Sequence, residues 1–192
     1  MTLAALLKEV RACALCEENL PLGPRPTISI HPGARIIIIG QAPGTKVHET
    51  GIAWNDPSGE RLRDWMQIDR DIFYDASRIA IMPMGFCYPG RLARGGDKPP
   101  RPECAPAWHD RLLAELPKLE LTLLTGLYAQ GYYLGRRAEK TLTATVKNWS
   151  AYGPAIIPTP HPSWRTAGWL TRNPWFEHDL LPVLRRRVRE LV

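Results

Sequence analysis

The sequence predicts an α/β fold, a three-layer α/β/α sandwich with a central four-stranded parallel sheet. Two observations carry this prediction. Four short apolar runs occur at residues 34–39, 79–82, 121–124 and 155–157, rich in β-branched residues or leucine without polar alternation. Such runs are typical of strands buried on both faces of a parallel sheet. Stretches with helical spacing separate the runs, and alternating strands and helices build this architecture through right-handed crossovers.

The first helix is expected near the start of the chain, where apolar residues recur at positions 3, 6, 7 and 10. After the first predicted strand, Asp56 and Pro57 match an N-cap followed by proline at the first helical position. The helix that follows places Leu62, Trp65 and Met66 on one face. Further helices are predicted at 107–116, 128–137 and 179–191, and the segment 87–104 is predicted to be a loop rich in Pro, Gly and Arg.

Length and composition restrict the class of protein. The 192 residues are expected to form one domain spanning 1–192. The net charge of +6 suits a polyanionic partner, and the composition excludes collagen-like, coiled-coil and disordered classes. Lys8 and Glu9 interrupt the first apolar stretch before a signal-peptide core could form, and no apolar run could span a bilayer. We therefore expect a cytoplasmic protein that does not contact membranes, and a monomer.

Unusual segments follow three of the predicted strands. They are the glycine-containing turn 40–44, the segment 85–87, and the proline-rich stretch 158–163. In open α/β sheets, ligands bind outside the carboxyl ends of the strands. The sequence therefore predicts that a functional site lies at this edge of the sheet.

Four cysteines form two separated pairs. Cys13 and Cys16 make a C-x-x-C near the start, Cys87 follows the second predicted strand, and Cys104 lies 17 positions later. Ordinary buried thiols are one explanation, because cysteine is among the most buried residue types. Four thiolates around zinc or a [4Fe–4S] cluster are the other, and spacing alone does not separate these two. The wide, irregular second pair favours iron–sulfur over a zinc ribbon.

Three motifs resemble the uracil-DNA glycosylase superfamily. They are Gly40-Gln-Ala-Pro-Gly44, the stretch 51–59 and His161-Pro-Ser163. The order and spacing of the four cysteines resemble the iron–sulfur branch known as family 4, and the resemblance runs from Cys13 to about Asp179. It implies a DNA glycosylase with a [4Fe–4S] cluster on these four cysteines, zinc being the less favoured alternative. The cluster would be structural and would pack the N-terminal segment 1–30 onto the domain.

The resemblance also assigns roles to residues of the site. The backbone of Gln41, Ala42 and Gly44 would hold a flipped base, which glycine allows to approach closely. Trp54 stands where the family usually has phenylalanine and would stack under the base, although core packing is the alternative. His161 would stabilise the negative charge on the departing base.

The segment after His161 resembles the loop that enters the minor groove in the superfamily. Ser163 begins it, Arg165 would contact phosphate, and Trp164 or Trp169 would fill the space that the base vacates. Anchoring of the loop on the core is an equal alternative for the two tryptophans. Arg91, Arg94, Lys98 and Arg101 form a basic stretch that is a further candidate for backbone contacts, or simply a solvated face.

Two departures from the family pattern concern catalysis and base recognition. Ala42 cannot orient water, so His48 and Glu49 are the nearest titratable candidates for that role. Pro83 stands where family 4 carries the asparagine that reads the uracil edge, and Asn55 is the candidate to replace it.

The favoured hypothesis is a DNA glycosylase that hydrolyses the N-glycosidic bond of uracil, or of a related deaminated base, by base flipping in DNA repair. One alternative is a glycosylase of the same fold that removes another damaged base. The other is a non-catalytic iron–sulfur protein that binds damaged DNA, which the combination of Ala42 and Pro83 motivates.

Overall fold

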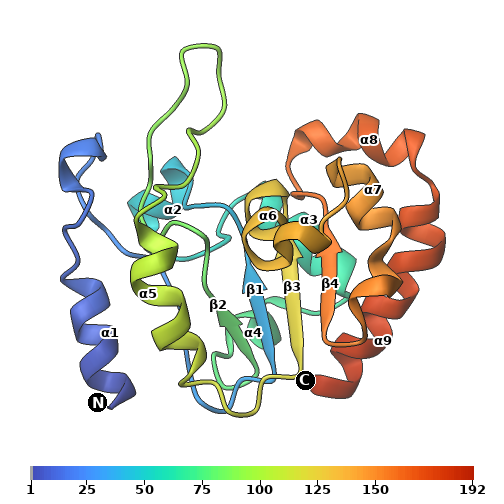
Figure 1. Ribbon diagram of the computed structural model, residues 1–192, viewed down its shortest axis with the longest axis horizontal. Coiled ribbons are helices and arrows are strands. Elements are labelled where there is room, and N and C mark those ends of the chain that lie inside the picture. Colours follow the sequence, from blue (N-terminus) through green and yellow to red (C-terminus); the bar gives the residue numbers. More distant parts are fainter. Residues whose placement is uncertain (1) are drawn as a thin grey trace.

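The computed structural model describes residues 2–192, which fold around one four-stranded sheet (Figure 1). The strands are β1 (Ile36–Ile39), β2 (Ile79–Ile81), β3 (Leu121–Thr125) and β4 (Ile156–Thr159). They are all parallel and lie in the order β2-β1-β3-β4. The predicted fold class is therefore confirmed. The ends of each predicted strand lie within two residues of the observed ends.

The sheet is buried on both faces, which explains why its strands lack polar alternation. Successive side chains of a strand point to opposite faces. Ile37 and Ile39 accordingly pack into one apolar cluster, and Ile36 and Ile38 pack into another. All four are fully buried.

Helices from distant parts of the chain cover the two faces. Helices α1 (Leu3–Arg11), α5 (Cys104–Leu113) and α6 (Leu127–Leu134) contribute to the cluster around Ile37. Helices α3 (Pro57–Met66), α4 (Arg70–Tyr74) and α9 (Leu181–Leu191) contribute to the cluster around Ile36. The remaining short helices are α2 (Thr45–Thr50), α7 (Leu142–Lys147) and α8 (Ala167–Arg172). No helix among residues 2–192 has the length and apolar character needed to cross a membrane.

The start of α3 agrees with the capping signal in the sequence. The Asp56 carboxylate accepts a hydrogen bond of 2.8 Å from the Gly59 backbone N–H, and Pro57 occupies the first turn. The predicted apolar face of this helix, Leu62, Trp65 and Met66, is buried. A cap of this kind stabilises a helix by about 1 kcal/mol.

The segment between β2 and α5 differs from a simple loop. It rises above the sheet as a narrow hairpin, seen in green in Figure 1. Arg91 and Asp97 face each other as an antiparallel pair, and the Leu92 N–H donates to the Gly96 carbonyl at 2.9 Å. Cys104, predicted to end the loop, instead begins α5.

His109 of α5 is fully buried beside the segment that follows β2. Its ring lies 2.6 Å from the Tyr133 hydroxyl and 3.2 Å from the Pro83 carbonyl oxygen, and it stacks on Phe86. Burial lowers the pKa of His109 to about 4.

This burial makes the stability of the protein depend on pH. Between pH 6.5 and 4 the unfolded chain binds a proton at His109 that the folded protein excludes, so stability falls as the pH falls through this window. At about 1.4 kcal/mol for each pH unit, we expect His109 to account for a loss of about 3 kcal/mol. Urea unfolding of wild type and His109→Gln at pH 4 to 7 tests this. A variant that loses as much stability as the wild type would contradict it.

Candidate functional site

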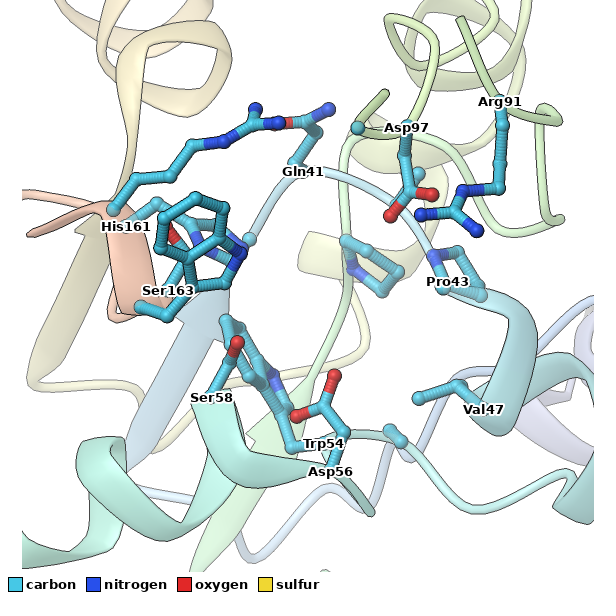
Figure 2. Close-up of a pocket in the computed structure, with 18 of the residues that line it drawn as sticks. Gln41, Pro43, Val47, Trp54, Asp56, Ser58, Arg91, Asp97, His161 and Ser163 are labelled. Carbon is cyan, nitrogen blue, oxygen red and sulfur yellow. The ribbon is translucent and has the colours of Figure 1, made fainter. Parts of the chain in front are cut away.

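A cavity of about 670 Å³ opens at the carboxyl ends of the strands. The turn after β1, the segment before α3, the end of β2, the hairpin and the segment after β4 all contribute to its wall. Figure 2 shows Trp54 and Asp56 on one side of this cavity, with Asp97 and Arg91 on the opposite side. The cavity thus lies at the edge of the sheet where the sequence predicted a functional site.

Trp54 forms part of the cavity wall in an unusual backbone conformation. Its φ of 57° lies in the left-handed region, which a bulky residue rarely adopts. Two glycines make this possible. A Cβ at Gly40 would lie 2.7 Å from the indole ring, and a Cβ at Gly59 would overlap the Trp54 carbonyl oxygen. The glycines of the two motifs therefore create the space for the tryptophan.

The segment that carries Trp54 is held by hydrogen bonds from α3 and α4. Tyr74 donates its hydroxyl proton to the Ala53 carbonyl at 2.9 Å, and buried Arg63 donates to the Trp54 carbonyl at 3.5 Å. Arg70 donates to the side-chain oxygen of Asn55 at 3.0 Å. Asn55 is thus engaged by Arg70 and does not line the cavity, although the sequence suggested it as a reader of the base.

Gly59→Ala tests whether this close approach positions Trp54. Alanine normally stabilises a helix by up to about 1 kcal/mol over glycine. Here the new methyl group would collide with backbone, and we expect a net loss of about 2 kcal/mol or more in the free energy of unfolding. Gly131→Ala in α6 is the matched control, because a Cβ there meets nothing within 4 Å. Urea denaturation should show opposite signs for the two variants, and equal effects would refute the argument.

His161 lies beside Trp54 at the end of β4. The two ring centroids are 5.5 Å apart, with the ring planes inclined by 31°. The His161 carbonyl accepts a short hydrogen bond from the Thr166 hydroxyl, which fixes the backbone. Burial lowers the pKa of His161, although Asp56 opposes the shift. The imidazole is therefore neutral at physiological pH and carries one N–H that can be donated.

Asp56 is a site residue that the sequence reasoning identified only as a helix cap. One carboxylate oxygen accepts the Gly59 N–H, and the side chain also lines the cavity beside Trp54 (Figure 2). Its influence on the pKa of His161 shows that the two groups are electrostatically coupled across the cavity. A capping residue at the N-terminus of a helix that points at a site can serve both roles, and this was the available signal.

His48 and Glu49, the predicted titratable candidates, lie in α2 outside the cavity wall. The His48 ring is 6.0 Å from that of Tyr88, and Glu49 is exposed. Successive side chains of a helix point in directions about 100° apart, so Val47 lines the cavity and its neighbours His48 and Glu49 do not. Local proximity to the motif in the sequence did not determine which side chain points inward.

The turn 40–44 lines the cavity along its length, as expected for a backbone that holds a ligand. Gln41 donates its side-chain amide to the Lys98 carbonyl at 3.3 Å, which links the turn to the hairpin. Pro83 also lines the cavity, and its carbonyl is occupied by His109. The position expected to read a base edge therefore presents only a ring without hydrogen-bonding groups.

The two tryptophans in the segment after His161 have different surroundings. Trp169 packs against Trp175 and Phe176, with ring centroids 5.5 Å away in both cases, and donates its indole N–H to Thr143. Trp164 is 77% exposed at the cavity mouth. Trp169 therefore anchors the loop on the core, whereas Trp164 is exposed at the cavity mouth.

The residues on either side of Trp164 are held in place. Arg61 donates to the Ser163 carbonyl at 2.5 Å. Arg165 lies over the Trp164 ring at 5.4 Å and approaches Gly96 of the hairpin. Ser163, Trp164 and Arg165 all line the cavity.

The four cysteines lie around a second, smaller pocket beside the first site, although the sequence separates them by up to 91 positions. Burial raises the pKa of Cys104 to about 12 and that of Cys87 to about 11, and the nearby Cys13 and Cys16 add to both shifts. The Phe86 backbone N–H donates to the Cys104 sulfur at 3.3 Å. As placed, the His, Cys, Asp and Glu side chains of residues 2–192 form no group that could hold a metal ion.

Comparison with known families gives one match. The sequence model described as the uracil DNA glycosylase superfamily matches residues 29–185, which is most of the chain. The match covers the whole sheet, every lining residue of the cavity except Thr27, and two of the four cysteines. Cys13 and Cys16 lie before its first residue.

Proposed function

Because the chain belongs to the uracil DNA glycosylase superfamily, whose function is of the DNA glycosylase type, we propose that it removes uracil, or a related deaminated base, from DNA by hydrolysis. One observation carries this proposal. An aromatic face, a neutral histidine and a carboxylate converge on one cavity at the carboxyl edge of the sheet, namely Trp54, His161 and Asp56. These groups supply stacking, charge stabilisation and a proton acceptor.

The reaction requires a nucleotide turned out of the helix. Its base would stack on Trp54, and base–aromatic stacking contributes about 1–3 kcal/mol. The glycosidic bond then breaks, and its electron pair leaves with the base. His161 would donate its N–H to a carbonyl oxygen of that base and stabilise the anion, while the backbone of the turn 40–44 holds the base in place.

Asp56 is our candidate for the group that orients water. Its free carboxylate oxygen would accept a proton from the water that attacks C1′ of the deoxyribose, so that a C1′–O bond replaces the C1′–N bond. Its negative charge would also stabilise positive character on the sugar. The cavity therefore contains a proton acceptor even though Ala42 has no polar side chain.

Arginines at the cavity mouth would bind the DNA backbone. Arg94 reaches the cavity from the hairpin, and Arg165 reaches it from the loop after β4. Guanidinium groups bind phosphate with two donors and release counterions on binding, so DNA affinity should fall steeply with salt. Exposed Trp164 would occupy the space that the flipped base leaves.

The residues around the second pocket fit a [4Fe–4S] cluster. Cys13, Cys16, Cys87 and Cys104 surround it, and a backbone N–H already donates to one sulfur. Four cysteine side chains around one pocket supply the number of thiolate ligands that such a cluster needs. Such a cluster would supply cross-links between the start of the chain, the end of β2 and α5.

Assays of base release test the proposed function. Oligonucleotides with uracil, hypoxanthine or xanthine, single-stranded and double-stranded, are incubated with iron-loaded protein, and the free base is measured. We expect release of at least one base and a fall of about 10²-fold or more in Asp56→Asn, which keeps the cap but cannot accept the proton. Release of no base by wild type would refute the enzyme and leave the non-catalytic alternative. Equal rates for wild type and Asp56→Asn would remove Asp56 from the mechanism.

A further inference from the structure

Resting on the proposed function, we infer that the Arg91–Asp97 pair of the hairpin reads the hydrogen-bonding edge of the flipped base. The pair would select bases with a lactam edge, in which a ring N–H lies beside a carbonyl oxygen. Uracil, hypoxanthine and xanthine share this edge. Cytosine and adenine present an unprotonated ring nitrogen beside an amino group instead.

The hairpin places the two side chains together. Arg91 and Asp97 are directly paired across its two antiparallel arms, so their side chains lie on the same face. Both residues line the cavity, and Figure 2 shows them entering from the side opposite Trp54 and Asp56. A base stacked on Trp54 would thus present an edge toward this pair.

Several contacts fix the hairpin over the cavity. Gln41 binds the Lys98 carbonyl, and the Lys98 N–H donates to the Gly90 carbonyl at 2.8 Å. Gly96 has a φ of 87° and leaves room for the guanidinium of Arg165, which lies against it. The pair is therefore held from the β1 turn on one side and from the loop after β4 on the other.

Both groups remain available for a ligand. Within residues 2–192, no hydrogen bond or salt bridge engages the Asp97 carboxylate or the Arg91 guanidinium. Partial burial raises the pKa of Asp97, which Arg91 and Arg165 oppose and Asp56 reinforces. The carboxylate therefore has no fixed partner and can accept an N–H from a ligand.

The pair supplies the hydrogen-bond donor and acceptor that the Pro83 side chain lacks. An amide side chain offers one acceptor and one donor, which is what a lactam edge needs. Asp97 would accept the ring N–H, and Arg91 would donate to the adjacent carbonyl oxygen. The two charges together reproduce the donor and acceptor of one amide, and they approach from the hairpin instead of the end of β2.

Binding without turnover tests this inference. The probes are DNA strands with 2′-fluoro-2′-deoxyuridine, whose glycosidic bond resists hydrolysis, and matched strands with a stable abasic analogue. Affinities are measured by fluorescence anisotropy for wild type, Asp97→Ala, Arg91→Ala and Asp97→Asn. Lys98→Ala removes a charge from the same hairpin outside the cavity wall and is the matched control. The readout is the ratio of the two affinities, from which general backbone binding cancels.

We expect Asp97→Ala and Arg91→Ala to reduce the preference for the uracil probe over the abasic probe about tenfold. Asp97→Asn keeps an acceptor and should retain most of the preference. Lys98→Ala should weaken both affinities alike. An unchanged ratio in Asp97→Ala, or the same preference for a 2′-fluoro cytosine probe as for uracil, would overturn the inference. Failure of the proposed function is distinguishable, because it would show as no base release while the binding preference persists.

Discussion

Replacing His161 with alanine is expected to lower the rate of base release by about 10²–10³-fold, the effect typical of losing one donor to a developing anion. The departing base carries the electron pair of the glycosidic bond, so a donor aimed at its carbonyl oxygen stabilises it. Burial lowers the pKa of His161, so the neutral imidazole would donate its N–H to the anion without transferring the proton. DNA binding, which depends on the mouth arginines, should change far less than the rate.

Single-turnover release of free base from uracil-containing DNA measures this effect. His48→Ala is the matched control, since it removes the same side chain from α2 outside the cavity wall and should leave the rate nearly unchanged. Because the His161 pKa lies below its usual value, the wild-type rate should hold below pH 6.5 as far as this histidine is concerned. A His161→Ala rate within threefold of wild type, or an equal loss in His48→Ala, would exclude the proposed role.

The second large effect is expected from the cysteines. Cys104→Ala should abolish iron binding and lower the free energy of unfolding by at least about 3 kcal/mol, or roughly 6–12 °C in Tm for a chain of this size. The reason is that a cluster would cross-link Cys13 and Cys16 near the start of the chain to Cys87 after β2 and to Cys104 at the start of α5. The raised pKa values of Cys87 and Cys104 mean that loading releases protons, so loading should improve with rising pH.

Iron content, the visible absorption spectrum and thermal unfolding of anaerobically purified protein measure this. Wild type stripped of metal is the control and should unfold at the same temperature as Cys104→Ala. About four iron atoms per chain are expected in wild type, from the composition of the cluster. Colourless protein with one zinc per chain would show that the site binds the alternative metal, zinc, instead of a cluster. No metal, with equal stability of variant and wild type, would identify four ordinary buried thiols.

Much of the fold followed from local patterns. Apolar runs without alternation are typical of buried parallel strands, and all four became strands of one parallel sheet. The pairing of Asp56 with Pro57 located the start of α3. Element ends were less well predicted, because contacts with other elements decide where a helix stops or starts. Cys104 shows this, since it begins α5 where the sequence suggested continued loop.

The residues of the candidate site were likewise predicted from the sequence only in part. Motif residues such as Trp54 and His161 lie together as the motifs implied. The sequence did not place Asp56, Arg91 and Asp97 in one cavity, because two of them lie in a loop without a recognisable motif and the third already had a structural explanation as a cap. Asn55 and His48, which were apparent, are turned away from the cavity.

The sequence by itself determined the fold class, the edge of the sheet that carries the site, and the residue types available there. These depend on short-range periodicity and on motifs that are contiguous in the chain. Only the tertiary structure decided which side chains face the cavity, that Trp164 and not Trp169 is exposed, and that the hairpin brings Arg91 and Asp97 over the site. The physical reason is that side-chain direction depends on how elements distant in sequence pack, and a shift of one residue turns a side chain from the cavity to solvent.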